Sequence, residues 1–283
     1  MKVLKYITLI IFSLFATNVL ASNKLRIATY NIHYGKGEND YRQSNWSQED
    51  MESIIDSISS VITSLKPDII ALQELDSGMI SRNKRFLIAE IAKRTKGRYR
   101  FVYVPTHTLD GGNIGCGALI SCKFKEYKVF SVPLPGDEPR TLIKIHFPKF
   151  IFAITHGDLN NAKRKCAFQT ILRELGKTNK PTFLAGDLND CCTWKNDGSS
   201  FNILLKEFTV ISDTHCNTVW NGKHALPNDR QGIIDYILLN KRNNSVSVID
   251  SHIVTKIADK NILLKKVSDH YPVYVDVCVK AAY

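Results

Sequence analysis

Several features that would place a protein in a class at once are missing from this 283-residue sequence. No C-x-x-C pair and no cysteine/histidine cluster has the spacing of a structural zinc site. After residue 21, no stretch is apolar enough to span a bilayer, which takes about 20 residues. Internal repeats, low-complexity segments and interdomain linkers are missing as well. These absences exclude a zinc module, a membrane protein with several spans and a repeat protein.

The first 21 residues have the layout of a secretory signal peptide. Lysines at positions 2 and 5 precede an apolar stretch from Ile7 to Phe15, and the segment ends in Val-Leu-Ala. We therefore expect cleavage after Ala21, one mature domain at residues 22–283, and a secreted or periplasmic location. A membrane anchor is the alternative, although the apolar stretch is short for a bilayer.

The chain has a strong positive charge and an odd number of cysteines. Its formal net charge is +11, which falls to +9 when Lys2 and Lys5 are removed. Such a surplus favours polyanionic partners, such as nucleic acid or anionic lipid head groups, although a basic surface that only keeps the protein soluble is the alternative. All seven cysteines follow residue 21, so at least one lacks an intrachain disulfide partner.

Hydrophobic periodicity predicts alternating strands and helices in the first third of the chain. A strand at 24–30 is followed by a helix at 47–65, in which apolar residues recur at steps of three and four. Ser47 and Asp50 form a candidate capping pair, and Pro67 ends this helix. A buried strand at 69–72 and a helix at about 84–95 come next.

The middle of the chain has a different pattern. Between residues 99 and 155 there are five short strand candidates with no helix between them, which requires antiparallel neighbours and does not fit an eight-fold barrel. Alternation then resumes with a helix at 161–176, a strand at 181–186, a short helix at 200–207 and three more strands. The pattern predicts an α/β fold, a four-layer αββα sandwich of two mixed β-sheets with outer helices.

Polar residues collect where the apolar strands end. Asp235 lies inside an otherwise apolar strand, and because an unpaired buried carboxylate is costly, it needs a partner such as a histidine. Each polar residue alone has a modest explanation as a cap, a strand end or a core histidine. Together, on strands that converge on one rim, they predict a site made of Asn31, Glu74, His156, Asp187, Asn189, Asp235, Asp269 and His270.

The residue types indicate metal-assisted hydrolysis. Glu74 and Asp269 are hard oxygen ligands suited to Mg²⁺ or Mn²⁺, with Asn31 and water completing an octahedron. Asp235 can hold the imidazole of His270 in one tautomer and make it a general base toward water. Because no serine or cysteine nucleophile with a partnered base accompanies this set, direct attack of water on a metal-bound phosphate is the economical mechanism.

Three further residues complete the expected chemistry. Asn189 donates an amide, and Asp187 orients the nucleophile or protonates a leaving oxygen. His156 offers a proton to a phosphate oxygen.

Six short motifs occur in an order that resembles the endonuclease/exonuclease/phosphatase superfamily. They are TYNIH (29–33), LQELD (72–76), THGDL (155–159), GDLND (186–190), IDYIL (234–238) and SDHYPV (268–273). The resemblance spans residues 24–278 and implies the deoxyribonuclease-I-like fold. The resemblance implies the same site residues that the polar strand ends predict. It also suggests Arg140, in the stretch PRT, near the phosphate, and likens Arg164 and Gln169 to a pair on the family's helix after the histidine motif.

The sequence departs from the family pattern at three places, one of which is Gly157 in THGDL, where Leu is usual. Many secreted bacterial members have a Gly-Asn-Ala strand, where this chain reads Gly115-Cys116-Gly117-Ala118. The acidic partner that supports the first catalytic histidine of pancreatic-type nucleases has no counterpart in the local stretch YVPTH.

The superfamily cleaves several kinds of phosphate ester, so the fold alone does not give the substrate. Cationic segments at 81–85, 92–100 and 162–165 are compatible with binding a phosphate backbone, and solvated surface is their alternative explanation. The leading hypothesis is a monomeric, secreted or periplasmic Mg²⁺-dependent endonuclease acting on DNA or RNA. A phosphoinositide phosphatase or sphingomyelinase-type phospholipase C is the alternative, and an inactive binding or toxin subunit is a third.

Overall fold

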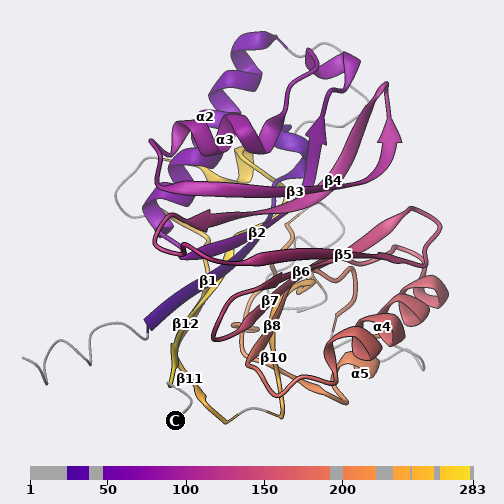
Figure 1. The fold of residues 1–283 in the computed structure, drawn as a ribbon. Helices are drawn as coiled ribbons and strands as arrows, with labels where there is room; N and C mark the ends of the chain where they lie inside the picture. Colours follow the sequence, from indigo (N-terminus) through magenta and orange to yellow (C-terminus); the bar gives the residue numbers. More distant parts are fainter. Residues whose placement is uncertain are drawn as a thin grey trace, which may run out of the picture.

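The computed structural model describes residues 24–37, 47–191, 200–220, 232–242, 244–257 and 262–280. The predicted signal peptide and its cleavage point lie outside these residues. Within them, two six-stranded sheets pack face to face and carry helices on their outer faces (Figure 1). The predicted four-layer αββα sandwich is confirmed.

The first sheet has the order β11-β12-β1-β2-β4-β3. The central pair β1 and β2 is parallel, whereas the other neighbours are antiparallel, so the sheet is mixed. In that order the strands are Val246–Ile253, Val273–Val279, Lys24–Asn31, Ile69–Ser77, Gly112–Ser121 and Tyr99–Leu109.

The second sheet has the order β5-β6-β7-β8-β10-β9 and is mixed in the same way, with β7 and β8 as the parallel pair. Its strands are Lys128–Leu134, Arg140–His146, Ile151–His156, Thr182–Asp187, Asp235–Asn240 and Phe208–Val210. The five strands expected between residues 99 and 155 all form. The sequence pattern did not predict β9, which has only three residues.

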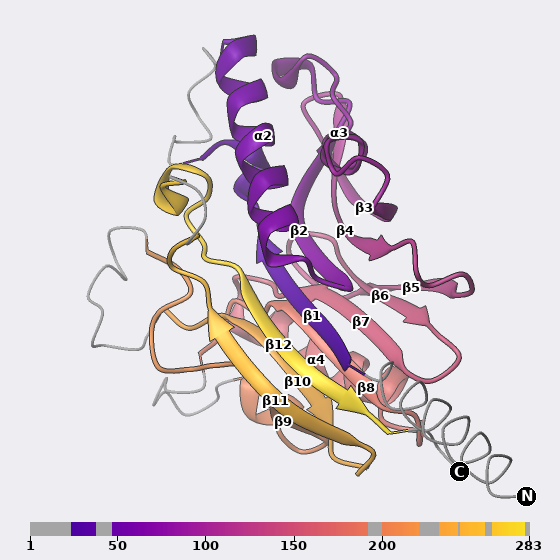
Figure 2. The same ribbon diagram turned by 90° about the vertical axis from the view of Figure 1, so that its left-hand side faces the viewer.

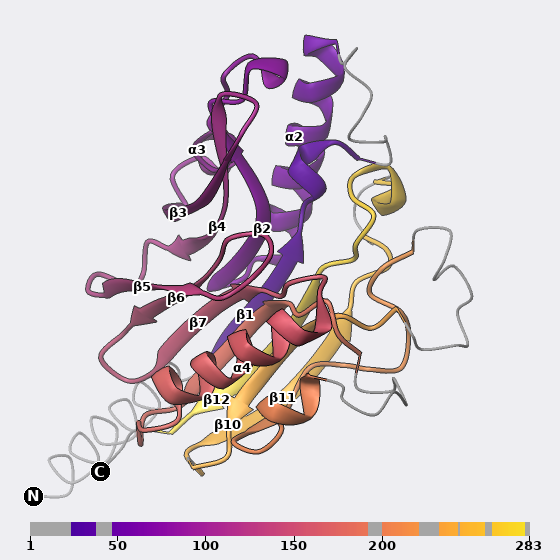
Figure 3. The same cartoon turned by 90° about the vertical axis from the view of Figure 1, so that its right-hand side faces the viewer.

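Two pairs of helices cover the outer faces. Helices α2 (Gln48–Leu65) and α3 (Leu87–Arg94) pack on the first sheet (Figure 2). Helices α4 (Asn161–Leu175) and α5 (Phe201–Leu204) pack on the second (Figure 3). A third apolar cluster fills the space between the sheets. None of these helices, within the described ranges, is long and apolar enough to cross a membrane.

Local signals in the sequence set the ends of α2. The Ser47 hydroxyl accepts a hydrogen bond from the backbone N–H of Asp50 at 3.0 Å, so the predicted capping pair is confirmed. At the other end Lys66 adopts a left-handed conformation with φ of 50°, directly before Pro67. The helix therefore stops where the sequence indicated.

The topology brings the polar strand ends to one rim. Because β1 is parallel to β2, and β7 is parallel to β8, the carboxyl ends of each pair lie at the same edge of their sheet. Asp235, the first residue of β10, pairs in register with Asp187, the last residue of β8. The two sheets also contact each other through β1 and β8. Residues far apart in the chain thus meet at one end of the sandwich.

Candidate active site

Asn31 joins the two sheets at this rim. It is the last residue of β1 and is fully buried. Its amide nitrogen donates to Oε1 of Glu74 at 2.9 Å and to Oδ2 of Asp187 at 3.0 Å. Glu74 lies on β2 of the first sheet and Asp187 on β8 of the second. One side chain therefore fixes the distance between two carboxylates from different layers.

A β-bulge presents Glu74 to the rim. Leu72 pairs with Gly117 and Leu75 with Gly115, so β2 has one more residue than β4 across this stretch. Leu72 and Leu75 both pack in the outer apolar cluster although they are three residues apart, which a regular strand does not allow. Glu74 itself has φ of 57°, a left-handed conformation that is costly outside glycine. The strained backbone is what turns its carboxylate toward Asn31.

Asp235 and His270 form the pair that the sequence predicted. Nδ1 of His270 lies 2.7 Å from Oδ2 of Asp235, and both side chains are buried. Burial alone lowers a histidine pKa, but the Asp235 carboxylate and its hydrogen bond raise the pKa of His270 well above its usual value. Since Nδ1 faces the carboxylate, the Nε2 atom of His270 faces the rim, 3.8 Å from Oδ2 of Asp187.

Asp187 lies between two histidines. Its Oδ2 atom is 3.4 Å from Nε2 of His156 and 3.8 Å from Nε2 of His270. Burial raises a carboxyl pKa, but hydrogen bonding by His156 and the charge of His270 outweigh it, so the pKa of Asp187 lies below its usual range. Asp187 is therefore a carboxylate at neutral pH and acts as an acceptor, not as a proton donor.

The partner of His156 is an arginine. Nη1 of Arg140 lies 3.0 Å from Nδ1 of His156, and Nη2 of Arg140 lies 2.7 Å from Oε2 of Glu138. A guanidinium has no acceptor, so Nδ1 of His156 must accept and carries no proton. The ring proton is then on Nε2, which points to Asp187. A cation thus faces Nδ1 of His156, and His156 is a neutral donor.

Two glycines allow the strand ends to approach closely near Asn189. A Cβ on Gly186 would lie 1.9 Å from the Thr155 carbonyl oxygen, and one on Gly157 would lie 2.1 Å from that of Leu188. The Gly157 carbonyl in turn accepts a hydrogen bond from the side-chain amide of Asn189 at 2.9 Å. The unusual glycine in THGDL thus has a steric reason.

Asp269 provides a test of whether the rim fits a cation. Among the described residues, its Oδ1 atom is buried and has no hydrogen-bond partner. The nearest basic nitrogens are Nδ1 of His33 at 3.6 Å and Nε2 of His270 at 3.9 Å, both beyond hydrogen-bond distance. A buried carboxylate oxygen without a partner is costly, and a divalent cation would satisfy it. The donor set of Asn31, Glu74 and Asp269 fits Mg²⁺ or Mn²⁺.

A second group of possible ligands lies beside the first. One atom from each of Asp187, Asp235 and His270 falls within 4.8 Å of the others. Because Nδ1 of His270 and Oδ2 of Asp235 are already bonded to each other, this group is less free to hold an ion than Glu74 and Asp269 are. Oxygen ligands also suit Mg²⁺ better than imidazole does.

Sequence reasoning missed three residues at the site. The His33 backbone N–H donates to Oδ1 of Asn31 at 3.0 Å, and Tyr34 is packed so that burial and the charge of Glu74 raise its pKa above the usual range. His33 is the last residue of the TYNIH motif, and Tyr34 follows it directly. Cys116 faces the same cluster, and burial raises the pKa of its thiol to about 12. The sequence signal for Cys116 was that its strand lacks the asparagine of the family's Gly-Asn-Ala pattern.

Two of the predicted cationic segments, 81–85 and 162–165, follow the carboxyl ends of β2 and β7 and so lie at the rim end of the sandwich, but their arginines make contacts within the protein. Arg85 pairs with Glu52 and Glu90, and Arg164 with Ser200 and Asp190. Arg100 lies at the start of β3, at the opposite end of the sandwich. Arg164 is buried and is bonded within the fold to Ser200, Asp190 and the Asp158 carbonyl.

Solved structures with the same fold support this description. An endonuclease/exonuclease/phosphatase from Beutenbergia cavernae DSM 12333 is 17% identical, with a TM-score of 0.67, over 92% of this chain and 72% of that one. The mannosyl-6-phosphatase Bt3783 of Bacteroides thetaiotaomicron VPI-5482 is 17% identical, with a TM-score of 0.61, over 89% and 99%. D. rerio TDP2, solved with a single-strand DNA product, is 16% identical, with a TM-score of 0.61, over 90% and 99%. At such low identity these likenesses show a shared fold.

The sequence itself was compared with curated proteins and with family models. No curated protein is significantly similar to it. One family model, described as the Endonuclease/Exonuclease/phosphatase family, matches residues 28–270, which is most of the chain and includes every rim residue named above. The chain belongs to the endonuclease/exonuclease/phosphatase family.

Proposed function

We propose that this protein is a secreted or periplasmic, divalent-metal-dependent phosphoesterase that cleaves a phosphate ester by attack of water. The observation that carries the proposal is the chain of contacts from Glu74 through Asn31 and Asp187 to the two histidines. These contacts support the proposal because they bring together Glu74, Asp187 and two histidines, which suit the roles of metal ligand, ionised acceptor, base and neutral donor.

The residues divide the chemistry between them. Asn31, Glu74 and Asp269 hold the cation, which when bound neutralises phosphate charge and favours attack on phosphorus. In its neutral form, which the raised pKa restricts to higher pH in the metal-free protein, His270 takes a proton from the attacking water at Nε2, and Asp235 stabilises the imidazolium that forms. Asp187 orients the water.

His156 and Asn189 act on the phosphate. His156 donates its Nε2 proton as a hydrogen bond to a phosphate oxygen, because Arg140 keeps Nδ1 unprotonated. Asn189 supplies an amide donor beside Asp187, to whose Oδ1 atom its own backbone N–H is bonded at 2.9 Å.

Nucleic acid is our first choice of substrate. The net charge of +11 favours a polyanion, and the fold is shared with D. rerio TDP2, solved with single-strand DNA. A phosphatase acting on small phosphate monoesters is the second candidate. It is favoured by the engagement of Arg85, Arg140 and Arg164 in contacts within the protein, which leaves fewer cations for a long phosphate backbone.

A substrate panel with and without metal tests the proposal. The mature protein should hydrolyse at least one of plasmid DNA, single-stranded DNA, RNA, a phosphoinositide, sphingomyelin or a sugar phosphate. Chelation by EDTA should abolish this activity, and Mg²⁺ or Mn²⁺ should restore it. Undiminished activity in the chelator contradicts the metal role, and a preparation inactive on every phosphate ester contradicts the function.

The export part of the proposal has its own test. It rests on the residue pattern at 1–21, and we expect the mature protein from the native host to begin at Ser22. A mature chain that retains Met1 would contradict it.

A further inference from the structure

A cavity of about 660 Å³ lies at the end of the sandwich opposite to the rim. It is lined by the start of β3, the segment before β5, the end of β6 and the segment before β8. These elements belong to both sheets. The carboxyl ends of β7 and β8 carry the rim residues, whereas the amino ends of the same strands lie toward this cavity. It is therefore separate from the candidate active site.

Four cations from three different segments line this cavity. They are Arg100, Lys125, Lys128 and Lys180, and the one carboxylate among the lining residues is that of Glu126. Within the described part of the chain, none of the four cations forms an ion pair with a carboxylate. Several other lysines do, such as Lys123 with Asp68 at 2.5 Å and Lys144 with Glu174 at 2.7 Å. The cavity thus concentrates positive charge that the protein does not neutralise.

An aromatic wall and one histidine complete the cavity. The rings of Tyr127 and Phe147 are 5.6 Å apart, and the Arg100 guanidinium lies 5.3 Å from the centre of the Tyr127 ring. Nε2 of His146 is buried and has no hydrogen-bond partner among the described residues. Burial and the nearby charges of Lys144 and Lys180 lower the pKa of His146. The nearby positive charge thus makes protonation of the His146 imidazole less favourable.

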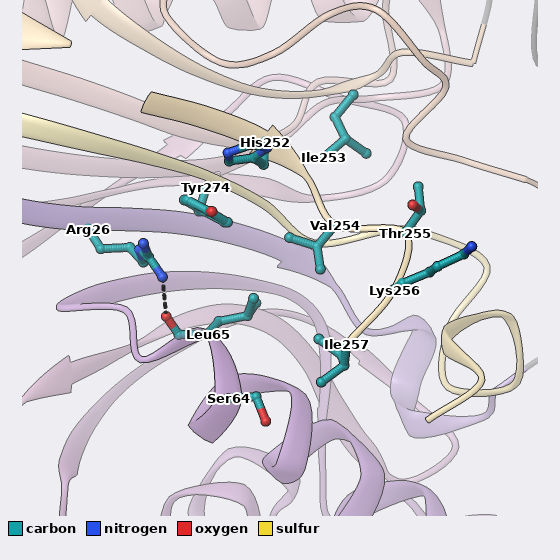
Figure 4. Close-up of a pocket in the computed structure, with 10 residues that line it drawn as sticks. All are labelled: Arg26, Ser64, Leu65, His252, Ile253, Val254, Thr255, Lys256, Ile257 and Tyr274. Carbon is teal, nitrogen blue, oxygen red and sulfur yellow. Dashed lines mark hydrogen bonds between the residues drawn. The ribbon is translucent and has the colours of Figure 1, made fainter. Parts of the chain in front are cut away.

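A second cavity, of about 300 Å³, shows the contrast (Figure 4). It also contains an arginine, Arg26, but that guanidinium is bonded to the Leu65 carbonyl and to Asp276. Its positive charge is neutralised within the fold. Arg100 of the larger cavity also donates to a backbone carbonyl, that of Phe124, but among the described residues none of the four cations there has a carboxylate partner.

We infer that the cavity lined by Arg100, Lys125, Lys128 and Lys180 is a binding site for a phosphate-bearing anion, distinct from the catalytic rim. The spread of the four cations over three segments suits a multiply charged group, and the Tyr127–Phe147 wall accommodates an apolar or ring-shaped portion attached to it. A soluble phosphate compound and a lipid phosphate head group share this chemistry.

Inorganic pyrophosphate is the probe for the soluble source. Binding to the mature protein is measured by calorimetry in the presence of EDTA, so that metal at the rim plays no part. The double variant Lys128→Gln/Lys180→Gln should bind roughly tenfold more weakly, because it loses half of the cations. The control Lys93→Gln/Lys96→Gln removes the same charge from exposed positions outside the cavity and should bind like the wild type.

His146 gives a second readout at the site itself. An anion in the cavity favours the charged imidazole, so pyrophosphate should raise the pKa of His146 in an NMR titration. Vesicles of phosphatidylcholine and phosphatidic acid, compared with pure phosphatidylcholine, then test the lipid source by co-sedimentation. Binding to the mixed vesicles that the Lys128/Lys180 variant loses assigns the site to a head group.

The proposal is overturned if pyrophosphate and mixed vesicles both fail to bind, or if the two double variants bind them equally. Binding of single-stranded DNA without a response to either probe would also overturn it, because it would point to a surface that follows a nucleic-acid backbone. Phosphoesterase activity of the Lys128/Lys180 variant should equal that of the wild type. Anion binding at the cavity and hydrolysis at the rim are thus measured separately, so either proposal can fail without the other.

Discussion

The two histidines at the rim differ in the group bound to their Nδ1 atoms. His270 faces the carboxylate of Asp235 at 2.7 Å, whereas His156 faces the guanidinium of Arg140 at 3.0 Å. A carboxylate favours the imidazolium, and a guanidinium disfavours it. One ring is thereby suited to taking a proton and the other to donating a hydrogen bond while neutral.

Replacing Asp235 by asparagine tests the first of these roles. The change keeps the size of a fully buried side chain but removes the charge that stabilises the His270 imidazolium. We expect turnover to fall by roughly 10³-fold with little change in the far-ultraviolet circular dichroism. A loss of less than about tenfold in a folded variant would contradict the role of the pair.

Replacing Arg140 by methionine tests the second role. With no donor at Nδ1, His156 can take either tautomer, so turnover should fall by about 10-fold to 100-fold. The ¹⁵N shifts of the ring should move away from those of a pure Nε2–H tautomer. Glu138→Gln is the matched control, since it removes the other partner of Arg140 and leaves the contact with His156 in place. Unchanged ring shifts in the methionine variant would show that Arg140 does not set the tautomer.

Sequence reasoning predicted the Asp235–His270 contact but not the Arg140–His156 contact. A carboxylate in an apolar strand needs a partner because burying it unpaired is costly, and this need can be inferred from the residue pattern. Whether Arg140 points at His156 depends on the register of β6 against β7, for which the sequence holds no local signal.

The element that shapes the site most is the bulge in β2. A one-residue insertion reverses the faces of all later side chains, and it allows Leu75 to pack outward while Glu74 turns to the rim. The sequence showed that a polar residue follows a buried strand. It did not show the left-handed backbone of Glu74, because a bulge arises from pairing with β4 and not from local propensity.

Strand β1 is held to its neighbours by Arg26. Its Nε and Nη2 donate to the two carboxylate oxygens of Asp276 on β12, both at 2.8 Å, and its Nη1 donates to the Leu65 carbonyl at the end of α2 (Figure 4). The guanidinium also lies 4.2 Å from the centre of the Tyr274 ring. One side chain thus connects two strands and a helix terminus.

Asp276→Asn should therefore lower the free energy of unfolding by about 2 kcal/mol at pH 7. The hydrogen bond from Arg26 lowers the pKa of Asp276, so this stabilisation is present above the carboxyl's unfolded-state pKa and disappears as the pH falls through the folded-state value. Urea unfolding at neutral and acidic pH measures the difference, which should shrink in acid. Asp250→Asn, at an exposed position on the adjacent β11, is the control and should leave the stability nearly unchanged. Equal effects of the two variants would contradict the assignment to Arg26.

At the scale of the whole molecule, the fold could be predicted because apolar residues recur with different periods in strands and in helices, and because residues 99–155 show no helical pattern. That pattern requires two mixed sheets, and the shared end of the parallel pairs then brings the polar residues together. The positions of the cations could not be predicted from the sequence, because they depend on which arginines form ion pairs within the fold. Four of the chain's 38 lysines and arginines line the cavity at the end of the sandwich opposite to the rim.

The joining of the two sheets at the rim predicts that metal binding stabilises the whole fold. Glu74 comes from the first sheet, Asp187 from the second and Asp269 from the segment before β12, so the metal-free protein holds three carboxylates close together. An ion that binds only the folded state adds about 2.7 kcal/mol at a hundred times its dissociation constant, which corresponds to a rise of about 5 °C in the melting temperature. We expect this rise with Mg²⁺ in calorimetric scans of the wild type and of the distant control Glu126→Gln. Glu74→Gln should melt at or above the metal-free wild-type temperature, because it removes a repulsive charge, and should gain little from Mg²⁺. A full Mg²⁺ response in Glu74→Gln would place the ion elsewhere and remove Glu74 from the ligand set.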